Sequence, residues 1–199
     1  MTVDPGLLLI PPAPAAWYGK RMNRKDDPEA QSGLGATEAV IVVVQPQTVW
    51  FDEVLAVAQR LEQAKYVVRD PGHVDEVLLL GAFCGQRCVG FLLCFVQVIG
   101  REEGRSVLRD ASGTILREGY VDAFGVLLEY RRQGLGRRLQ EHAVGLCVDR
   151  ACYQIRSRSP ITSKENYSLK LSLGYAIQPS VENDSYYFIR TLPRGGIRE

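Results

Sequence analysis

The feature that most constrains the fold is a strand, a glycine-rich turn and an amphipathic helix that follow one another directly. Residues 120–128 are rich in apolar and β-branched side chains and predict a strand, and residues 134–149 predict a helix with one apolar face. A further short strand is expected at 153–157. Strands joined in this way by a helix run parallel, and the connection is right-handed. The chain must therefore contain a parallel strand pair with a helix packed across it.

The remaining segments predict antiparallel strands and further helices. The strand-like segments are 39–44, 76–83, 88–99, 175–178 and 186–191, and the helical segments are 51–64 and 166–173. The second and third of these strands surround a short turn, which is typical of a hairpin. We therefore expect an α+β fold with a single mixed, mostly antiparallel sheet of about six to seven strands flanked by helices.

Composition divides the chain into three zones. Residues 1–36 hold five of the ten prolines and a glycine-rich stretch, which predicts a leader with little regular structure. The folded domain is expected at 37–192, and 193–199 form a C-terminal tail. The polar segment 100–117 is a candidate for an extension near the second substrate or for a dimer contact, so a homodimer stays an open alternative.

Charge and cysteine content exclude several classes of protein. A net charge of +1 gives no global reason to bind nucleic acid. The chain has no apolar run of membrane-spanning length and no good signal peptide, so we expect a cytoplasmic protein without a membrane partner. Five cysteines do not suggest a disulfide framework, and no second cysteine pair or nearby histidine completes a metal site with Cys84 and Cys88.

A short motif rich in glycine and arginine lies between the predicted strand and the predicted helix. Its residues are Arg131-Arg132-Gln133-Gly134-Leu135-Gly136. The first backbone N–H groups of a helix lack partners within the helix and carry partial positive charge, so they form an anion site. Glycine allows close approach, and the neighbouring arginines can pair with phosphates. The motif therefore predicts a cradle for a ligand that carries a pyrophosphate.

Two other phosphate loops fit the motif less well. No Lys-Ser or Lys-Thr follows the glycines, as the loop of nucleotide hydrolases requires. Leu139 stands where the dinucleotide fingerprint has its third glycine, which argues against a dinucleotide-dependent redox enzyme.

The pattern Arg-x-x-Gly-x-Gly between a strand and a helix resembles the acyl-CoA-binding motif of the GNAT superfamily of N-acyltransferases. Residues 121–126 and 128–130 look like the central strand of that family and the turn into the cradle, and Leu173-Gly174-Tyr175 resembles its later Gly-aromatic step. The resemblance implies an enzyme that moves an acetyl group from acetyl-CoA, as co-substrate, to an amine of a small molecule or peptide by direct attack in a ternary complex. The alternative is a catalytically degenerate GNAT fold that binds acyl-CoA as a sensor or scaffold.

The same resemblance implies a parallel strand pair that splays at the cofactor site, where the pantetheine arm pairs with the exposed strand edge. Gly125 suits a bulge there, and the N–H of Val126 suits the thioester oxygen and its oxyanion. The implied cofactor-binding residues are Phe124, Gly125, Val126, Arg131, Arg132, Gln133, Gly134, Leu135, Gly136 and Arg137. No metal is implied.

An attacking amine must lose a proton, and the leaving thiolate must gain one. Asp122 is the candidate base and Glu118 a weaker second choice, although a structural role for Asp122 is an equal alternative. Lys170 occupies the position where many family members carry the tyrosine that protonates the thiolate, so Tyr167, one turn earlier, is the candidate substitute. Cys152 lacks a base partner, which favours direct transfer.

The identity of the amine acceptor is not readable from these residues. In the family the acceptor is selected by loops that correspond here to 63–72 and 178–184. Glu182 and Asp184 lie in the second loop and are candidates for attracting a cationic amine, or are merely solvated.

Overall fold

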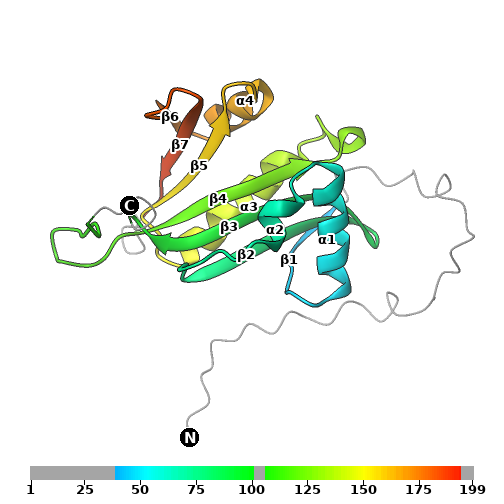
Figure 1. The fold of residues 1–199 in the computed structure, drawn as a ribbon, viewed down its shortest axis with the longest axis horizontal. Helices are drawn as coiled ribbons and strands as arrows, with labels where there is room; N and C mark the ends of the chain where they lie inside the picture. The colour runs from blue at the N-terminus through cyan, green and yellow to red at the C-terminus, as the bar shows by residue number, and fades with distance from the viewer. Residues whose placement is uncertain (1–38, 101–105, 194–199) are drawn as a thin grey trace, which may run out of the picture. The chain divides into compact units, whose positions relative to one another are not determined.

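The computed structural model describes residues 39–100 and 106–193, which form one seven-stranded sheet in the order β1-β2-β3-β4-β5-β7-β6 (Figure 1). The strands are β1 (Val40–Val43), β2 (Glu76–Cys84), β3 (Arg87–Val98), β4 (Arg117–Val126), β5 (Gln154–Pro160), β6 (Ala176–Pro179) and β7 (Ser185–Thr191). The α-helices are α1 (Val49–Arg60), α2 (Ala64–Val68), α3 (Leu135–Asp149) and α4 (Lys164–Ser172), and a 3-10 turn, η5, spans Leu128–Tyr130. The predicted leader and all but the first residue of the predicted tail lie outside the described residues.

The sheet is mixed, as predicted. Strands β4 and β5 are parallel and are joined through α3, whereas the other strand pairs within the described residues are antiparallel. Helices α1 and α2 lie on one face of the sheet and α3 lies on the other (Figure 1). None of the helices described is both long enough and apolar enough to cross a membrane.

Two apolar cores hold the helices to the sheet. One contains Leu80, Leu92 and Val121 under α3, and the other contains Leu79 and Leu93 under α1. Neighbouring residues of β2 and β3 therefore face opposite cores, which is why these strands are apolar at almost every position rather than at every second one.

The parallel pair splays, and the point of separation is defined by register. Residues Glu118–Val121 of β4 pair with Gln154–Ser157 of β5, and from Asp122 onward the two strands no longer pair. The rest of β5 pairs only with β7. A gap bordered by the last residues of β4 and β5 results, at the end of the sheet where α3 begins.

The bulge that was expected at Gly125 lies instead at Asp122. In the pairing with β3, Leu93 faces Ala123 and Cys94 faces Val121, so Asp122 is the extra residue. Gly125 pairs regularly with Phe91. Glycine is explained there by close packing, because a Cβ atom at this position would lie 2.5 Å from Cδ1 of Leu61.

Two element predictions were also wrong. Strand β4 ends at Val126 rather than Leu128. The N–H of Leu127 still donates a hydrogen bond to the Val89 carbonyl of β3, but the chain then turns into η5. Helix α2 lies within the segment 63–72, which the sequence predicts to be a loop. Within α2, Tyr66 and Val67 pack against the core beneath α1, so a tertiary contact supports a helix too short to be stable alone.

Candidate active site

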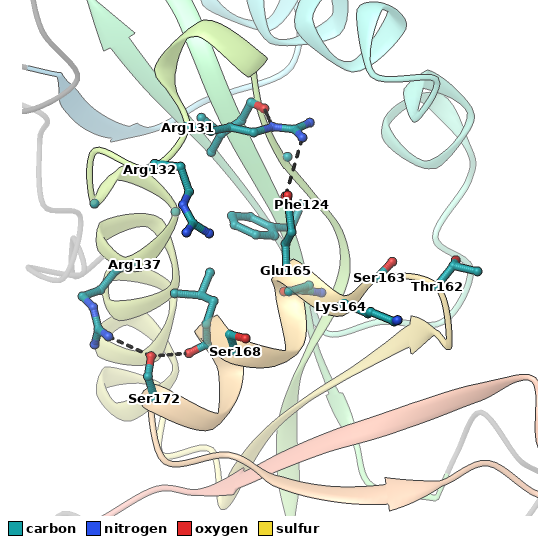
Figure 2. A pocket seen from close by; sticks show the side chains of 16 residues that line it. Phe124, Arg131, Arg132, Arg137, Thr162, Ser163, Lys164, Glu165, Ser168 and Ser172 are labelled. Atoms are coloured by element: carbon teal, nitrogen blue, oxygen red, sulfur yellow. Dashed lines mark hydrogen bonds and ion pairs between the residues drawn. The ribbon is translucent and has the colours of Figure 1, made fainter.

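A cavity of about 720 Å³ opens between the splayed strands, the start of α3 and helix α4 (Figure 2). One wall comes from β4 and the turn into α3, and the other from the segment 162–172. The lining residues are Phe124, Gly125, Val126, Arg131, Arg132, Gly134, Gly136, Arg137, Thr162, Ser163, Lys164, Glu165, Asn166, Ser168, Leu169 and Ser172. The structure thus brings together eight of the ten predicted cofactor-binding residues.

The cradle is formed by the first turn of α3. Gly134 caps this helix in the left-handed conformation with φ of 81° and has no side-chain cap, and a Cβ atom there would meet open space. The first N–H groups of α3 consequently have no acceptor within the helix. The side chains of Gln133 and Leu135 do not line the cavity, because Gln133 donates to the Glu129 carbonyl and Leu135 is buried in the core. Their predicted contribution is a backbone N–H, which does not depend on the side chain.

Three arginines stand on one wall of the cavity and α4 on the other (Figure 2). Arg131 donates from Nε to the Val126 carbonyl at 2.9 Å, and its Nη1 lies 3.8 Å from Glu165 on the opposite wall. Arg137 donates to Ser172 of α4 at 2.7 Å. Positive charge therefore surrounds the cradle, and two of the arginines contact α4 across the cavity.

The backbone edge of β4 faces the gap at alternate residues. Leu127 donates to β3, and backbone groups alternate in direction along a strand, so the groups of Phe124 and Val126 point away from β3. The Phe124 N–H donates to Oε1 of Gln63 at 3.2 Å, and Nε2 of Gln63 donates to the Phe124 carbonyl at 3.3 Å. The edge that the resemblance assigns to the pantetheine arm is thus contacted by side chains from outside the sheet.

Asp122 lies at the bulge, outside the cavity lining. Its side chain is 7% exposed, and its Oδ1 accepts a hydrogen bond from Nη2 of Arg69 at 2.7 Å. The guanidinium of Arg69 also lies over the rings of Tyr66 and Phe95. The predicted base is therefore a buried carboxylate held by an arginine, and its catalytic role stays a prediction.

Glu118 belongs to a buried polar network. Its carboxylate accepts hydrogen bonds from Arg156, Gln97 and Gln154, with Nη2 of Arg156 at 2.8 Å. The Arg156 guanidinium lies in turn near the rings of Tyr120 and Tyr187. Both carboxylate oxygens have partners inside the protein, so the geometry gives Glu118 a structural role.

Tyr167 is not part of the cavity lining. Its hydroxyl donates to the Pro160 carbonyl at 2.7 Å, and its ring packs on Tyr186 and Phe188. Burial raises the pKa of Tyr167. A role as proton donor to the thiolate stays a prediction, and it requires the hydroxyl to leave Pro160.

Lys170, at the position of the usual tyrosine, is almost completely buried. It donates to Ser157 at 2.7 Å and to Gln140 at 3.3 Å, and burial lowers its pKa to about 7. Its side chain does not line the cavity.

The two acidic residues of the β6–β7 loop are paired within the protein. Arg158 of β5 donates to both Glu182 and Asp184. Hydrogen bonds from Ser185 and Arg158 lower the pKa of Asp184 to about 2. The single positive charge of Arg158 offsets about half of the negative charge of these two carboxylates, which weakens the idea that they attract a cationic amine.

The cysteines are buried thiols. A hydrogen bond with Cys147 and burial raise the pKa of Cys152, and burial raises the pKa of Cys88 to about 12. Thiols of this kind are poor nucleophiles. Across residues 39–100 and 106–193, no group of three or more His, Cys, Asp or Glu side chains is arranged to hold a metal ion.

The sequence did not predict that the segment 162–172 forms the second wall of the cavity, or that Gln63 and Arg69, on either side of α2, contact β4. The wall at 162–172 follows β5 directly, and because β5 runs parallel to β4 its carboxyl end had to lie beside the cradle. That signal was available in the order of elements. Gln63 and Arg69 carried no comparable signal, since each contacts β4 from more than 50 residues away.

A mixed sheet whose parallel pair separates beside an arginine-lined helix start is the arrangement of an N-acyltransferase fold. The sequence pattern of the Acetyltransferase (GNAT) family matches residues 45–166, and the chain belongs to this family. The match includes the splayed pair and the cradle, and it ends within α4.

One curated relative and several solved structures are similar to parts or most of this chain. N-alpha-acetyltransferase 30 of Xenopus laevis is 32% identical over 85 residues, which are 42% of this chain and 31% of that protein. Arabidopsis thaliana NAA60, solved with a bisubstrate analogue, superposes with a TM-score of 0.60 at 13% identity, covering 79% of this chain and 99% of that one. The ribosomal-protein-S18-alanine N-acetyltransferase of Escherichia coli gives 0.54 at 17% identity, covering 81% and 97%. At these identities, the two structures show a shared fold alone.

Proposed function

We propose that this protein transfers an acetyl group from acetyl-CoA to an amine of a small molecule or peptide by direct attack in a ternary complex. The observation that carries the proposal is the cavity at the splayed strand pair, where an uncapped helix start and three arginines face one volume of about 720 Å³. The cytoplasmic location expected from the sequence is part of this proposal.

The residues present fit acetyl-CoA as a substrate. The backbone N–H groups of 133–137 would hold the pyrophosphate, with charge from Arg131, Arg132 and Arg137. The edge of Phe124, Gly125 and Val126 would pair with the amides of the pantetheine arm. Arabidopsis NAA60, which has this fold, has also been solved with acetyl-CoA, which supports the choice of ligand.

The chemistry assigned to this chain follows from the β4 edge. Acetyl-CoA supplies the acetyl group as a thioester. The Val126 N–H would donate to the thioester oxygen, which gains negative charge as the amine attacks. Asp122 would take the proton of the amine, directly or through water. As the C–N bond forms, the C–S bond would break and coenzyme A would leave as a thiolate, which water would protonate. The name of the relative, N-alpha-acetyltransferase 30, specifies an alpha-amine, and the name of the Escherichia coli structural neighbour specifies an alanine of a ribosomal protein. Both names favour a peptide or protein amine as acceptor here.

The test is calorimetric titration of the wild type and of Gly134→Glu with acetyl-CoA, NADH and ATP. A glutamate at Gly134 would place bulk and negative charge in the cradle and strain its left-handed backbone. Gly145→Glu is the matched control, because Gly145 is an exposed glycine of the same helix with open space around it. Binding of acetyl-CoA alone, lost only in Gly134→Glu, supports the proposal. Failure of the wild type to bind acetyl-CoA would sink it.

A binding module without turnover is the second candidate. It is favoured by the ion pair that holds Asp122 and by the Tyr167 hydroxyl bound to Pro160. Turnover with a panel of peptide and small amines separates the two, since a sensor binds acetyl-CoA but releases no free thiol when an amine is added. The dinucleotide enzyme is tested by the NADH titration.

A further inference from the structure

We propose that Gln63 acts as a displaceable plug on the edge of β4, and that the amide-bearing arm of acetyl-CoA must take its place. This inference rests on the proposed function, because it concerns the site assigned there to the pantetheine arm. The plug would make Gln63 a determinant of coenzyme affinity that no motif in the sequence marks.

The first observation is the pair of hydrogen bonds between Gln63 and Phe124. The amide of Gln63 accepts from the Phe124 N–H and donates to the Phe124 carbonyl, at 3.2 and 3.3 Å. One side-chain amide thus satisfies both backbone groups that a neighbouring strand would satisfy. An extended ligand with amide groups, laid along the same edge, needs the same N–H and the same carbonyl.

The second observation is the place of Gln63 relative to the cavity. The cavity is lined by β4, the turn into α3, α3 itself and the segment 162–172. Gln63 comes from the connection between α1 and α2, on the other face of the sheet, and its Nε2 lies 3.6 Å from where a Cβ of Gly125 would be. It therefore contacts Phe124, a residue of the cavity lining, without lining the cavity itself, and it comes from the same connection and helix α2 that position Arg69.

The third observation is that the backbone of Gln63 is anchored while its side chain is half-buried. Its N–H donates to the Ala58 carbonyl at 2.7 Å, and its carbonyl accepts from Tyr66 at 3.0 Å. The side chain can therefore swing away from Phe124 without disturbing α1 or α2. Exchange of one amide for another leaves no backbone group of Phe124 unsatisfied.

The consequence is a lower apparent affinity for acetyl-CoA. We call the form in which Gln63 has left Phe124 the open form. If acetyl-CoA binds only this form, its apparent dissociation constant equals the intrinsic one divided by the fraction of protein that is open. The two hydrogen bonds between Gln63 and Phe124, each with an ordinary net stabilisation, keep the open form a minor one. Removing them should therefore tighten acetyl-CoA binding by about fivefold or more.

The experiment is calorimetric titration of the full chain with acetyl-CoA and with 3′-phosphoadenosine 5′-diphosphate, the nucleotide part of the coenzyme without the amide arm. The variants are Gln63→Ala and Gln63→Met, the second of which keeps the volume of the side chain but cannot hydrogen-bond. Gln59→Ala, an exposed glutamine in the last turn of α1, is the control. We expect both Gln63 variants to bind acetyl-CoA about fivefold more tightly or better, with nucleotide binding and the control unchanged.

If the wild type binds acetyl-CoA and the Gln63 variants bind it equally or more weakly, the proposal that Gln63 blocks the edge of β4 is wrong. The proposed function is then unaffected. If only Gln63→Ala binds acetyl-CoA more tightly, the hydrogen bonds are not the cause, because the effect then follows from the smaller volume of the alanine side chain. An equal increase in affinity for the nucleotide also contradicts the proposal, because the nucleotide lacks the pantetheine arm with which Gln63 is proposed to compete. If neither wild type nor variants bind acetyl-CoA, the proposed function fails and the plug with it.

Discussion

Arg69, just after α2, donates a hydrogen bond of 2.7 Å to Asp122, the bulged residue of β4. The two residues are 53 positions apart, and the aspartate is 7% exposed whereas the arginine is 46% exposed. The pair ties the α1–α2 face to the point where β4 and β5 separate. It also fixes the position of the carboxylate that is proposed to act as the base.

Arg69→Ala should lower the free energy of unfolding by about 1–3 kcal/mol, because it leaves a buried carboxylate without its main cation. Asp122→Asn should cost less, since the asparagine carries no charge. If Asp122 is the base, Asp122→Asn lowers kcat by about 100-fold or more, whereas Arg69→Ala retains most of kcat. Urea denaturation and steady-state kinetics of both single variants and the double variant measure these effects. Equal losses of kcat in the two single variants would instead make the ion pair, rather than the carboxylate, the functional unit.

Gly119 and Cys147 are packed so closely that they should be coupled energetically. A Cβ atom at Gly119 would lie 2.3 Å from Sγ of Cys147 and 3.3 Å from Sγ of Cys94. Gly119→Ala should destabilise the protein by about 1–3 kcal/mol through overpacking. Cys147→Ala removes the sulfur and should recover part of this loss in the double variant. Strictly additive costs in a denaturation cycle would show that the backbone, rather than the sulfur, resists the added methyl group.

Lys170 should make stability depend on pH. Burial lowers its pKa to about 7 in the folded protein, against an ordinary value of 10.5. Between these values the unfolded chain binds a proton that the folded protein does not, so stability rises with pH by about 1.4 kcal/mol per unit. Below pH 7 both states are protonated and the penalty is constant.

Lys170→Met removes this contribution. Its stability relative to the wild type should be greatest near pH 7 and should diminish toward pH 10, as measured by urea denaturation at several pH values. Lys164→Met, an exposed lysine of the same helix, is the control and should show no such trend. A constant difference between Lys170→Met and the wild type across this range would mean that the lysine keeps an ordinary pKa.

Tyr167→Phe tests the proton donor that the resemblance implied. The hydroxyl is bound to the Pro160 carbonyl, so we expect a change in kcat of less than about twofold and a stability loss of about 1 kcal/mol. Release of free thiol from acetyl-CoA with a reactive amine provides the assay. A tenfold or greater fall in kcat at unchanged KM would assign the proton transfer to Tyr167 after all.

The cradle was the most predictable part of the site, because its physics is local. Gly134, the neighbouring arginines and the helix start lie within a few residues of one another, and the structure places them on one cavity. The splay followed from a resemblance and not from the residues themselves. The bulge was misplaced at Gly125 because a glycine in a strand is compatible with either a bulge or a close neighbour, and only the position of Leu61 distinguishes them.

The sequence by itself determined the order of the strands and of every helix except α2, the parallel pair, and the glycine-rich helix start at which an anion cradle is proposed, since periodicity and helix-end chemistry act over a few residues. Only the tertiary structure decided which side chains surround the reacting edge. Gln63 and Arg69 reach β4 through chain segments of 61 and 53 residues, and Lys170 loses its contact with water through α3 and β5. These relationships depend on how distant elements pack, so no local pattern records them.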